Sequence, residues 1–144
     1  MEPLKVVIID DEADGRNILA LLLEQHFPAL QFSGFAENVA EGVKFIRKVK
    51  PDIIFLDVEM PDGTGFDLLS ACSGIQSHVI LVTAYNHYAI KAIKASVLDY
   101  LLKPVNRPEF IAAVNKALER NASIDSPTGI TALLESINKH LKVR

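Results

Sequence analysis

The chain has 144 residues, 49% of them hydrophobic, and a formal net charge of −3 at pH 7. This length and composition fit one domain with a full apolar core. No basic block is present, which disfavours nucleic-acid binding by this chain, and no apolar run approaches the roughly 18 residues of a membrane span.

The cysteine and histidine content indicates which covalent and metal-binding features the protein lacks. The single Cys72 cannot form an internal disulfide, so it fits a reduced, cytoplasmic chain. The four histidines lack the spacing of metal ligands, which argues against a zinc site. A strand starts at residue 5, and we therefore expect no signal peptide.

Strand-like and helix-like patterns alternate along the chain. Apolar runs predict strands over 5–9, 31–36, 52–56, 79–83 and 98–102. Helical spacing of apolar residues predicts helices over 14–26, 39–49, 64–73, 86–96 and 107–119. Two helix starts, Asn38 with Glu41 and Asn106 with Glu109, resemble capping boxes. Five such repeats predict an α/β, flavodoxin-like fold, a doubly wound five-stranded parallel sheet of order 2-1-3-4-5.

The end of the chain has a different character. Residues 121–129 are polar and predict a linker or turn, and a last helix is expected over about 128–142. We therefore assign 1–120 to the domain and 121–144 to a linker and terminal helix. Apolar residues in this helix have coiled-coil spacing: Ile130, Leu134, Ile137 and Leu141. The helix could pack on the core, form a dimer seam or lack order without a further domain.

Acidic residues end two of the predicted strands. Asp10 and Asp11 follow the first strand, and Asp57 follows the third. In a sheet of this order these strands flank the point where strand order reverses, which is where such sheets bind ligands. Three carboxylates there raise one another's pKa unless a cation lies among them, and hard oxygen ligands favour Mg²⁺.

The remaining strand ends supply complementary groups. The fourth strand ends in Thr83 and Ala84, and the fifth in Lys103 and Pro104. An acid, a hydroxyl, an ammonium and a metal suit a tetrahedral dianion, and the Asp57 carboxylate can attack phosphorus to give an acyl phosphate. Lys103 would offset charge on the phosphoryl oxygens. The small Ala84 leaves a path for the phosphoryl donor.

These residues resemble the receiver domain of two-component response regulators, and the resemblance covers residues 4–120. It rests on one set of strand-end positions in order: Asp10-Asp11, Asp57, Thr83 and Lys103-Pro104. The resemblance implies that Asp57 is the phosphoacceptor. It implies that Asp11 ligates Mg²⁺ (or Mn²⁺) directly, with Asp10 alongside through water and the Glu59 backbone carbonyl as a further ligand.

The same resemblance assigns roles around the phosphoryl group. Thr83 and Lys103 would contact it, and the Lys103–Pro104 peptide bond is expected to be cis. Asp62-Gly63 would form the turn after the acceptor strand. Tyr100 is either a half-exposed strand aromatic or a switch that turns inward when Thr83 moves toward the phosphate.

Two further residues could tune the lifetime of the acyl phosphate. Glu59 is either a solvated acid or, with Tyr85, a control on how fast water reaches the phosphate. His87 has no nucleophile partner in the pattern and is expected to be a surface residue at a helix start.

Residues 83–90 and 99–104 are similar to the LytR/AlgR class of response regulators, which usually carry a C-terminal LytTR DNA-binding domain. No such domain lies within these 144 residues, so we expect either a receiver cut after its linker or a stand-alone receiver. DNA binding and transcription regulation are then expected only through an absent output domain.

The resemblance implies a phosphorylation switch in a two-component phosphorelay. A sensor histidine kinase or a small acyl phosphate would phosphorylate Asp57. A homodimer would then form through the fourth helix, fifth strand and fifth helix. The chain would be no enzyme, since it catalyses only its own phosphorylation and dephosphorylation, and no membrane partner is expected.

Three other functions share part of this residue pattern. A haloacid-dehalogenase-type phosphatase also uses a strand-end Asp with Mg²⁺, but its second acid precedes Gly-Thr directly, whereas Glu59 precedes Met60-Pro61. A flavodoxin-like FMN binder would need a phosphate loop where the chain has Asp10-Asp11-Glu12. A pseudo-receiver acting only as a dimer module would not need the intact pocket.

Overall fold

The computed structural model describes residues 2–122. The terminal helix predicted over 128–142 lies outside the described residues. Within 2–122, no helix combines the length and the apolar character that crossing a membrane requires.

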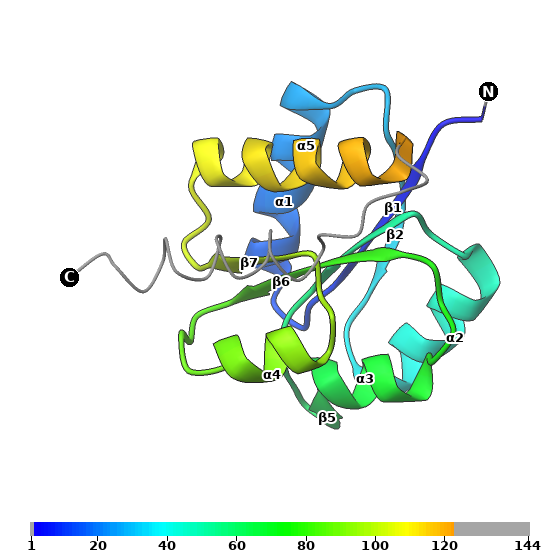
Figure 1. Ribbon diagram of the computed structural model, residues 1–144, viewed down its shortest axis with the longest axis vertical. Coiled ribbons are helices and arrows are strands. Elements are labelled where there is room, and N and C mark those ends of the chain that lie inside the picture. The colour runs from blue at the N-terminus through cyan, green and yellow to red at the C-terminus, as the bar shows by residue number, and fades with distance from the viewer. Residues whose placement is uncertain (1, 123–144) are drawn as a thin grey trace.

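A single parallel sheet forms the centre of the domain (Figure 1). Its strands are β1 (Lys5–Ile9), β2 (Gln31–Ala36), β3 (Ile53–Leu56), β6 (His78–Thr83) and β7 (Asp99–Leu102). They lie in the order β2-β1-β3-β6-β7, and every neighbouring pair is parallel. This is the predicted 2-1-3-4-5 order, with strand bounds within one residue of those expected.

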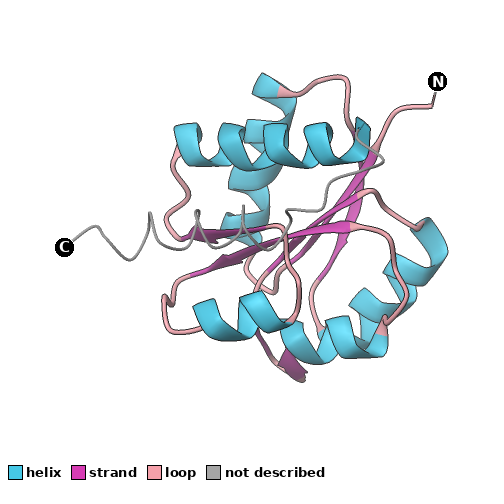
Figure 2. Ribbon diagram, in the orientation of Figure 1, coloured by secondary structure: helices cyan, strands magenta, loops and turns pink. Residues whose placement is uncertain are grey.

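Helices cover both faces of this sheet (Figure 2). One layer contains α1 (Ala13–His26) and α5 (Arg107–Ala122), and the other contains α2 (Val39–Val49), α3 (Gly65–Ala71) and α4 (Ala89–Lys94). The fourth helix is shorter than the predicted 86–96. It ends before Ser96 because that residue has a left-handed backbone conformation, with φ of 58°.

Strands β1, β3 and β6 are buried on both faces, as their near-continuous apolar sequences predict, whereas the edge strand β2 is largely exposed. In β1, Val7 and Ile9 belong to the core under α2, α3 and α4, whereas Val6 and Ile8 belong to the core under α1 and α5. In the second core Phe55 stacks on Phe110 of α5, with ring centroids 5.6 Å apart.

The turn expected at Asp62-Gly63 lies in a short hairpin after the third strand, whose two strands the sequence did not predict. The hairpin pairs β4 (Glu59–Met60) with β5 (Gly63–Thr64) and places Asp62 in its turn. The Asp62 carboxylate accepts backbone N–H bonds from Val39 at 2.7 Å and Ala40 at 3.0 Å. These bonds lower the pKa of Asp62 and attach the start of α2 to the segment that follows β3.

The helix caps agree with the sequence in two places and add a third. The Asn38 side chain accepts from the Glu41 N–H at 2.8 Å, and the Asn106 side chain accepts from the Glu109 N–H at 2.8 Å. A full capping box, which we had not predicted, starts α3, where Thr64 and Asp67 each bind the other's backbone N–H. Each cap therefore fixes where a loop at the sheet edge becomes a helix.

Gly65 at the start of α3 should be intolerant of any side chain. A Cβ there would lie 2.6 Å from the Asp57 carbonyl oxygen and 3.0 Å from Leu56 Cγ. Gly65→Ala should therefore lower the free energy of unfolding by about 1–3 kcal/mol in urea denaturation. Ser70→Ala, on the exposed side of the same helix, should change it by less than about 0.5 kcal/mol. Equal effects of the two changes would contradict this close approach.

Candidate functional site

The site begins with two acids that the sheet holds side by side. Ile9 and Leu56 are partners in the β1–β3 register, so Asp10 and Asp57 leave the sheet next to each other. The Asp57 N–H donates to the Ile9 carbonyl at 2.9 Å, and the Asp10 N–H donates to the Ala36 carbonyl at 3.0 Å. Backbone hydrogen bonds thus fix both acids at the carboxyl edge, and both are buried.

Lys103 reaches this pair from the end of β7. Its N–H donates to the Thr83 carbonyl at 2.8 Å, and its peptide bond to Pro104 is cis. Its ammonium lies 3.0 Å from Asp57 Oδ2 and 2.9 Å from Asp10 Oδ2. The third neighbour is Glu12 Oε1 at 3.1 Å. The ammonium is therefore surrounded by three carboxylates.

Burial and charge perturb both partners of the central pair. Desolvation by burial raises the pKa of Asp57 to about 6; the Lys103 charge opposes this shift and the Asp10 charge adds to it. Burial alone would lower the pKa of Lys103, but hydrogen bonds and charges from Asp10 and Asp57 raise it above its ordinary value. Lys103 therefore stays charged and only partly relieves the acids.

The acids form a set of oxygen donors. One carboxylate oxygen from each of Asp10, Asp11, Glu12 and Asp57 lies within 4.8 Å of the others. Asp11 and Glu12 are exposed, which leaves the set open to solvent. An all-oxygen donor set with room for water suits Mg²⁺. The structure thus brings the predicted Asp10, Asp11 and Asp57 together, while the role of the Glu59 carbonyl stays a prediction.

Thr83 lies at the end of the adjacent strand β6. It is fully buried, and its hydroxyl oxygen accepts a hydrogen bond from the Tyr85 N–H at 3.4 Å. Ala84, which follows it, is exposed. Their predicted contacts with a phosphoryl group and its donor stay predictions.

Tyr100 is buried, with 2% of its surface exposed, so the alternative of a half-exposed strand aromatic is wrong. Its hydroxyl donates to the Tyr85 carbonyl. Burial raises the pKa of this phenol, which therefore remains a donor at neutral pH. The inward position of the predicted switch is the one that this structure contains.

Glu59 has a neighbour that the sequence did not reveal. Its exposed carboxylate accepts a hydrogen bond from the Tyr88 hydroxyl at 3.3 Å. The Tyr88 ring contacts His87, with centroids 4.2 Å apart, and the Tyr85 ring at 6.3 Å. Tyr88 therefore links Glu59 to this group of rings. His87 is exposed, as expected of a surface residue.

Three other residues near the acids were missed, all at the start of α1. Glu12 contacts Lys103, and Arg16 Nη1 donates to the Asp10 carbonyl at 2.8 Å. Gly15 allows the helix to approach, because a Cβ there would lie 2.9 Å from Asp10 Oδ2. The run of three acids was a visible signal for Glu12, whereas nothing in the sequence pattern pointed to Gly15 or Arg16.

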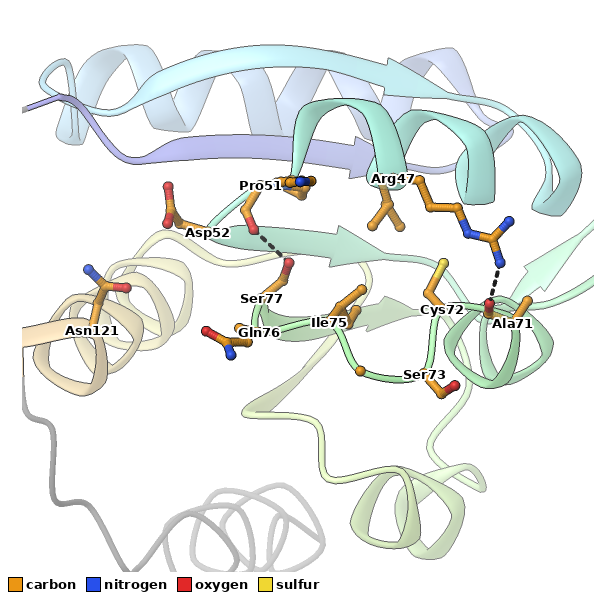
Figure 3. A pocket seen from close by; sticks show the side chains of 13 residues that line it. Arg47, Pro51, Asp52, Ala71, Cys72, Ser73, Ile75, Gln76, Ser77 and Asn121 are labelled. Atoms are coloured by element: carbon orange, nitrogen blue, oxygen red, sulfur yellow. Dashed lines mark hydrogen bonds between the residues drawn. The ribbon is translucent and has the colours of Figure 1, made fainter.

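A separate hollow of about 580 Å³ lies at the other end of the sheet (Figure 3). The segments before β3 and β6 line it, together with the ends of α2 and α3. Arg47 donates to the Ala71 carbonyl at 2.8 Å and Ser77 to the Pro51 carbonyl at 2.6 Å, so two of its polar side chains bind the chain itself. No predicted site residue lines this hollow, and the strand-end cluster is the better candidate.

Comparison with known proteins places this arrangement in a family. A sequence model of the response regulator receiver domain matches residues 6–115. The chain is 38% identical over 135 residues to an uncharacterized response regulatory protein of Vibrio parahaemolyticus, covering 93% of this chain and 54% of that protein. It is 34% identical over 116 residues to the sensory transduction protein LytT of Enterococcus faecalis, covering 79% and 48% respectively.

A third relative is the transcriptional regulatory protein BtsR of Escherichia coli, 31% identical over 134 residues, with 92% of this chain and 54% of that protein covered. The chain thus spans about half the length of the curated relatives that it matches.

Solved structures agree. The receiver domain of AraT from Geobacillus stearothermophilus has a TM-score of 0.75 and 29% identity, covering 85% of this chain and all of that one. The response regulatory domain of mrkE from Klebsiella pneumoniae has a TM-score of 0.75 and 26% identity, covering 81% and 97% respectively. With its strand order and strand-end residues, the chain belongs to the response regulator receiver family of two-component signalling.

Proposed function

We propose that this chain is a phosphoacceptor switch in which Asp57 receives a phosphoryl group in a Mg²⁺-dependent reaction. The observation that supports this most is the Lys103 ammonium, which lies 3.0 Å from the Asp57 carboxylate inside a cluster of acids. The proposed donor is a sensor histidine kinase, the kind of partner that receiver domains of this family have, or a small acyl phosphate.

In the proposed reaction an Asp57 carboxylate oxygen forms a bond to phosphorus. The bond from phosphorus to the donor's histidine nitrogen or acyl oxygen breaks, and its electron pair leaves with that atom. Lys103 is placed to offset charge on the phosphoryl oxygens. Bound Mg²⁺ (or Mn²⁺) would neutralise further charge there, held by Asp11 and Asp57, with Asp10 and the Glu59 carbonyl assisting. The chain would act on itself alone and would be no enzyme with a separate substrate.

The proposed switch is supported by the two hydrogen bonds of Tyr85. Its N–H donates to the Thr83 hydroxyl, and its carbonyl accepts from the Tyr100 hydroxyl. A movement of Thr83 toward a phosphoryl group would therefore pull on the same peptide segment that holds Tyr100. Tuning of the phosphate lifetime by Glu59 and Tyr85 belongs to the same proposal.

The output is proposed from the relatives. LytT is named a sensory transduction protein and BtsR a transcriptional regulatory protein, and the chain spans about half of each. We propose a cytoplasmic regulator of transcription whose LytTR domain binds DNA outside these residues. Its phosphorylated dimer would use α4, β7 and α5, where Ile90 of α4 has 69% of its surface exposed.

Asp57 should be the one acid that accepts the phosphoryl group. Incubation of the chain with acetyl phosphate and Mg²⁺ should yield one base-labile phosphate per chain, detected by intact-protein mass spectrometry. Asp57→Asn should acquire none, and neither should the unaltered chain with EDTA in place of Mg²⁺. Asp14→Asn, at an exposed acid on α1, should be phosphorylated normally. Full phosphorylation of Asp57→Asn would overturn the proposal.

The raised pKa of Asp57 predicts a pH-dependent stability without metal. A carboxyl whose folded pKa lies near 6 rather than 3.8 costs stability once it ionises, so this cost appears as pH rises from about 4 to 6. In urea denaturation with EDTA present, the free energy of unfolding of Asp57→Asn should exceed that of the unaltered chain by about 1–3 kcal/mol at pH 7.5. The difference should vanish near pH 4.

Asp62 provides a control of opposite sign in the same urea denaturation experiment. Its pKa is lowered by the Val39 and Ala40 N–H groups, so its ionised form stabilises the fold and this contribution is lost as pH falls. Asp62→Asn should therefore be less stable than the unaltered chain at pH 7.5 and approach it in acid. A stability gain in Asp57→Asn that does not change with pH would contradict the assignment to Asp57 ionisation.

Dimer formation should depend on the α4 surface. Beryllofluoride with Mg²⁺ should convert the chain to a dimer in sedimentation velocity, and Ile90→Glu should prevent this because it places a charge in the proposed interface. Ile18→Glu on α1, where 48% of the residue is exposed, should leave the dimer intact. A dimer that Ile90→Glu leaves unchanged would rule out this surface.

A further inference from the structure

The Lys103 ammonium has three N–H donors, and the structure gives it three carboxylate partners. Two of them, Asp10 and Asp57, are strand-end acids whose side chains are 2% and 8% exposed. The third, Glu12, lies at the rim with 66% of its side chain exposed. Glu12 is not among the residues that the sequence assigned to the site.

The position of Glu12 follows from its backbone. It is the residue before α1, its N–H donates to Asp10 Oδ1 at 2.9 Å, and its carbonyl accepts from the Arg16 N–H at 3.1 Å. One turn further, Gly15 has no Cβ, which would otherwise lie 3.4 Å from Lys103 Nζ. The start of α1 thus fixes Glu12 and leaves room for the ammonium beside it.

The ammonium and a divalent cation would use the same oxygens. Every contact between Lys103 and Asp10 or Asp57 neutralises a carboxylate that a metal ion needs. The Glu12 carboxylate at the rim attracts the Lys103 ammonium and so competes with its contacts to Asp10 and Asp57. The negative charge of Glu12 also adds to the negative potential of the acid cluster. Both effects act in the same direction, in favour of the cation.

We propose that Glu12 is a positioning residue that shares the Lys103 ammonium with Asp10 and Asp57 and so keeps those two carboxylates available to a divalent cation. This inference rests on the proposed function, because it concerns the Mg²⁺ dependence of the Asp57 site. Glu12 would also retain the ammonium at the pocket while Lys103 exchanges its Asp57 contact for a phosphoryl oxygen.

The test is the Mg²⁺ affinity of the full chain, measured by isothermal titration calorimetry at pH 7.5 and fixed salt. Glu12→Gln should weaken binding about 3- to 10-fold, the size expected for one partly exposed charge near the site. Asp14→Asn removes the same charge two residues away, from an exposed residue without a contact to Lys103 among the described interactions, and should weaken binding less than about twofold.

The variant Glu12→Asp distinguishes the effect of the contact with Lys103 from the effect of the negative charge at position 12. It keeps the negative charge on a side chain one methylene shorter, so it should weaken Mg²⁺ binding through the lost contact with Lys103, by less than Glu12→Gln, which removes the charge as well. In EDTA, NMR signals of the Lys103 side chain should shift in both Glu12 variants and stay unchanged in Asp14→Asn. This second measurement requires no metal and would not respond to a merely structural role.

The outcomes separate this inference from the proposed function. If Glu12→Asp binds Mg²⁺ like the unaltered chain, or Asp14→Asn weakens it as much as Glu12→Gln, the positioning role is overturned while phosphorylation of Asp57 stands. If the unaltered chain neither binds Mg²⁺ nor accepts a phosphoryl group, the proposed function fails as well.

Discussion

Repulsion among carboxylates at one edge of the sheet is the constraint on which the rest of the site depends. Parallel strands end at the same edge, and the β1–β3 register together with backbone hydrogen bonds holds Asp10 and Asp57 next to each other. Three of the four clustered acids contact the Lys103 ammonium, and the pKa of Asp57 is raised to about 6 despite that partner. The fold tolerates this strain because two apolar cores hold the strands from both faces.

Much of this arrangement could be predicted from the sequence because it follows from the sheet. Strands buried on both faces leave continuous apolar runs, so strand bounds and the acids after them were visible without coordinates. Once the strand order is 2-1-3-4-5, Asp10 and Asp57 have to be neighbours, and Lys103 lies at the end of another strand of the same edge. Periodicity and topology suffice for these residues.

The contacts of Glu12, Asp62 and Tyr88 could not be predicted in that way. Each depends on the path of a loop or on the reach of a side chain, and neither follows from periodicity. Asp62 caps a helix whose start lies 23 residues earlier in the chain, and Tyr88 meets Glu59 across 29 residues. Alone, such residues are indistinguishable from solvated polar groups. The predicted end of the fourth helix was wrong for a similar reason. The left-handed backbone conformation at Ser96 is a local feature that apolar periodicity does not reveal.

The loop after β6 connects this charged edge to the surface of the domain. Thr83 and Tyr100 both bind the peptide groups of Tyr85, one at its N–H and the other at its carbonyl. A hydrogen bond of this kind contributes about 1 kcal/mol net, and a shift between two populated states needs a few kcal/mol. In the proposed switch, these two bonds would be of the right size to couple phosphorylation of Asp57 to the segment that leads into α4. Lys103, whose ammonium contacts the crowded acids, also donates its backbone N–H to the Thr83 carbonyl, so a chain of hydrogen bonds runs from these acids through Thr83 and Tyr85 to the buried Tyr100.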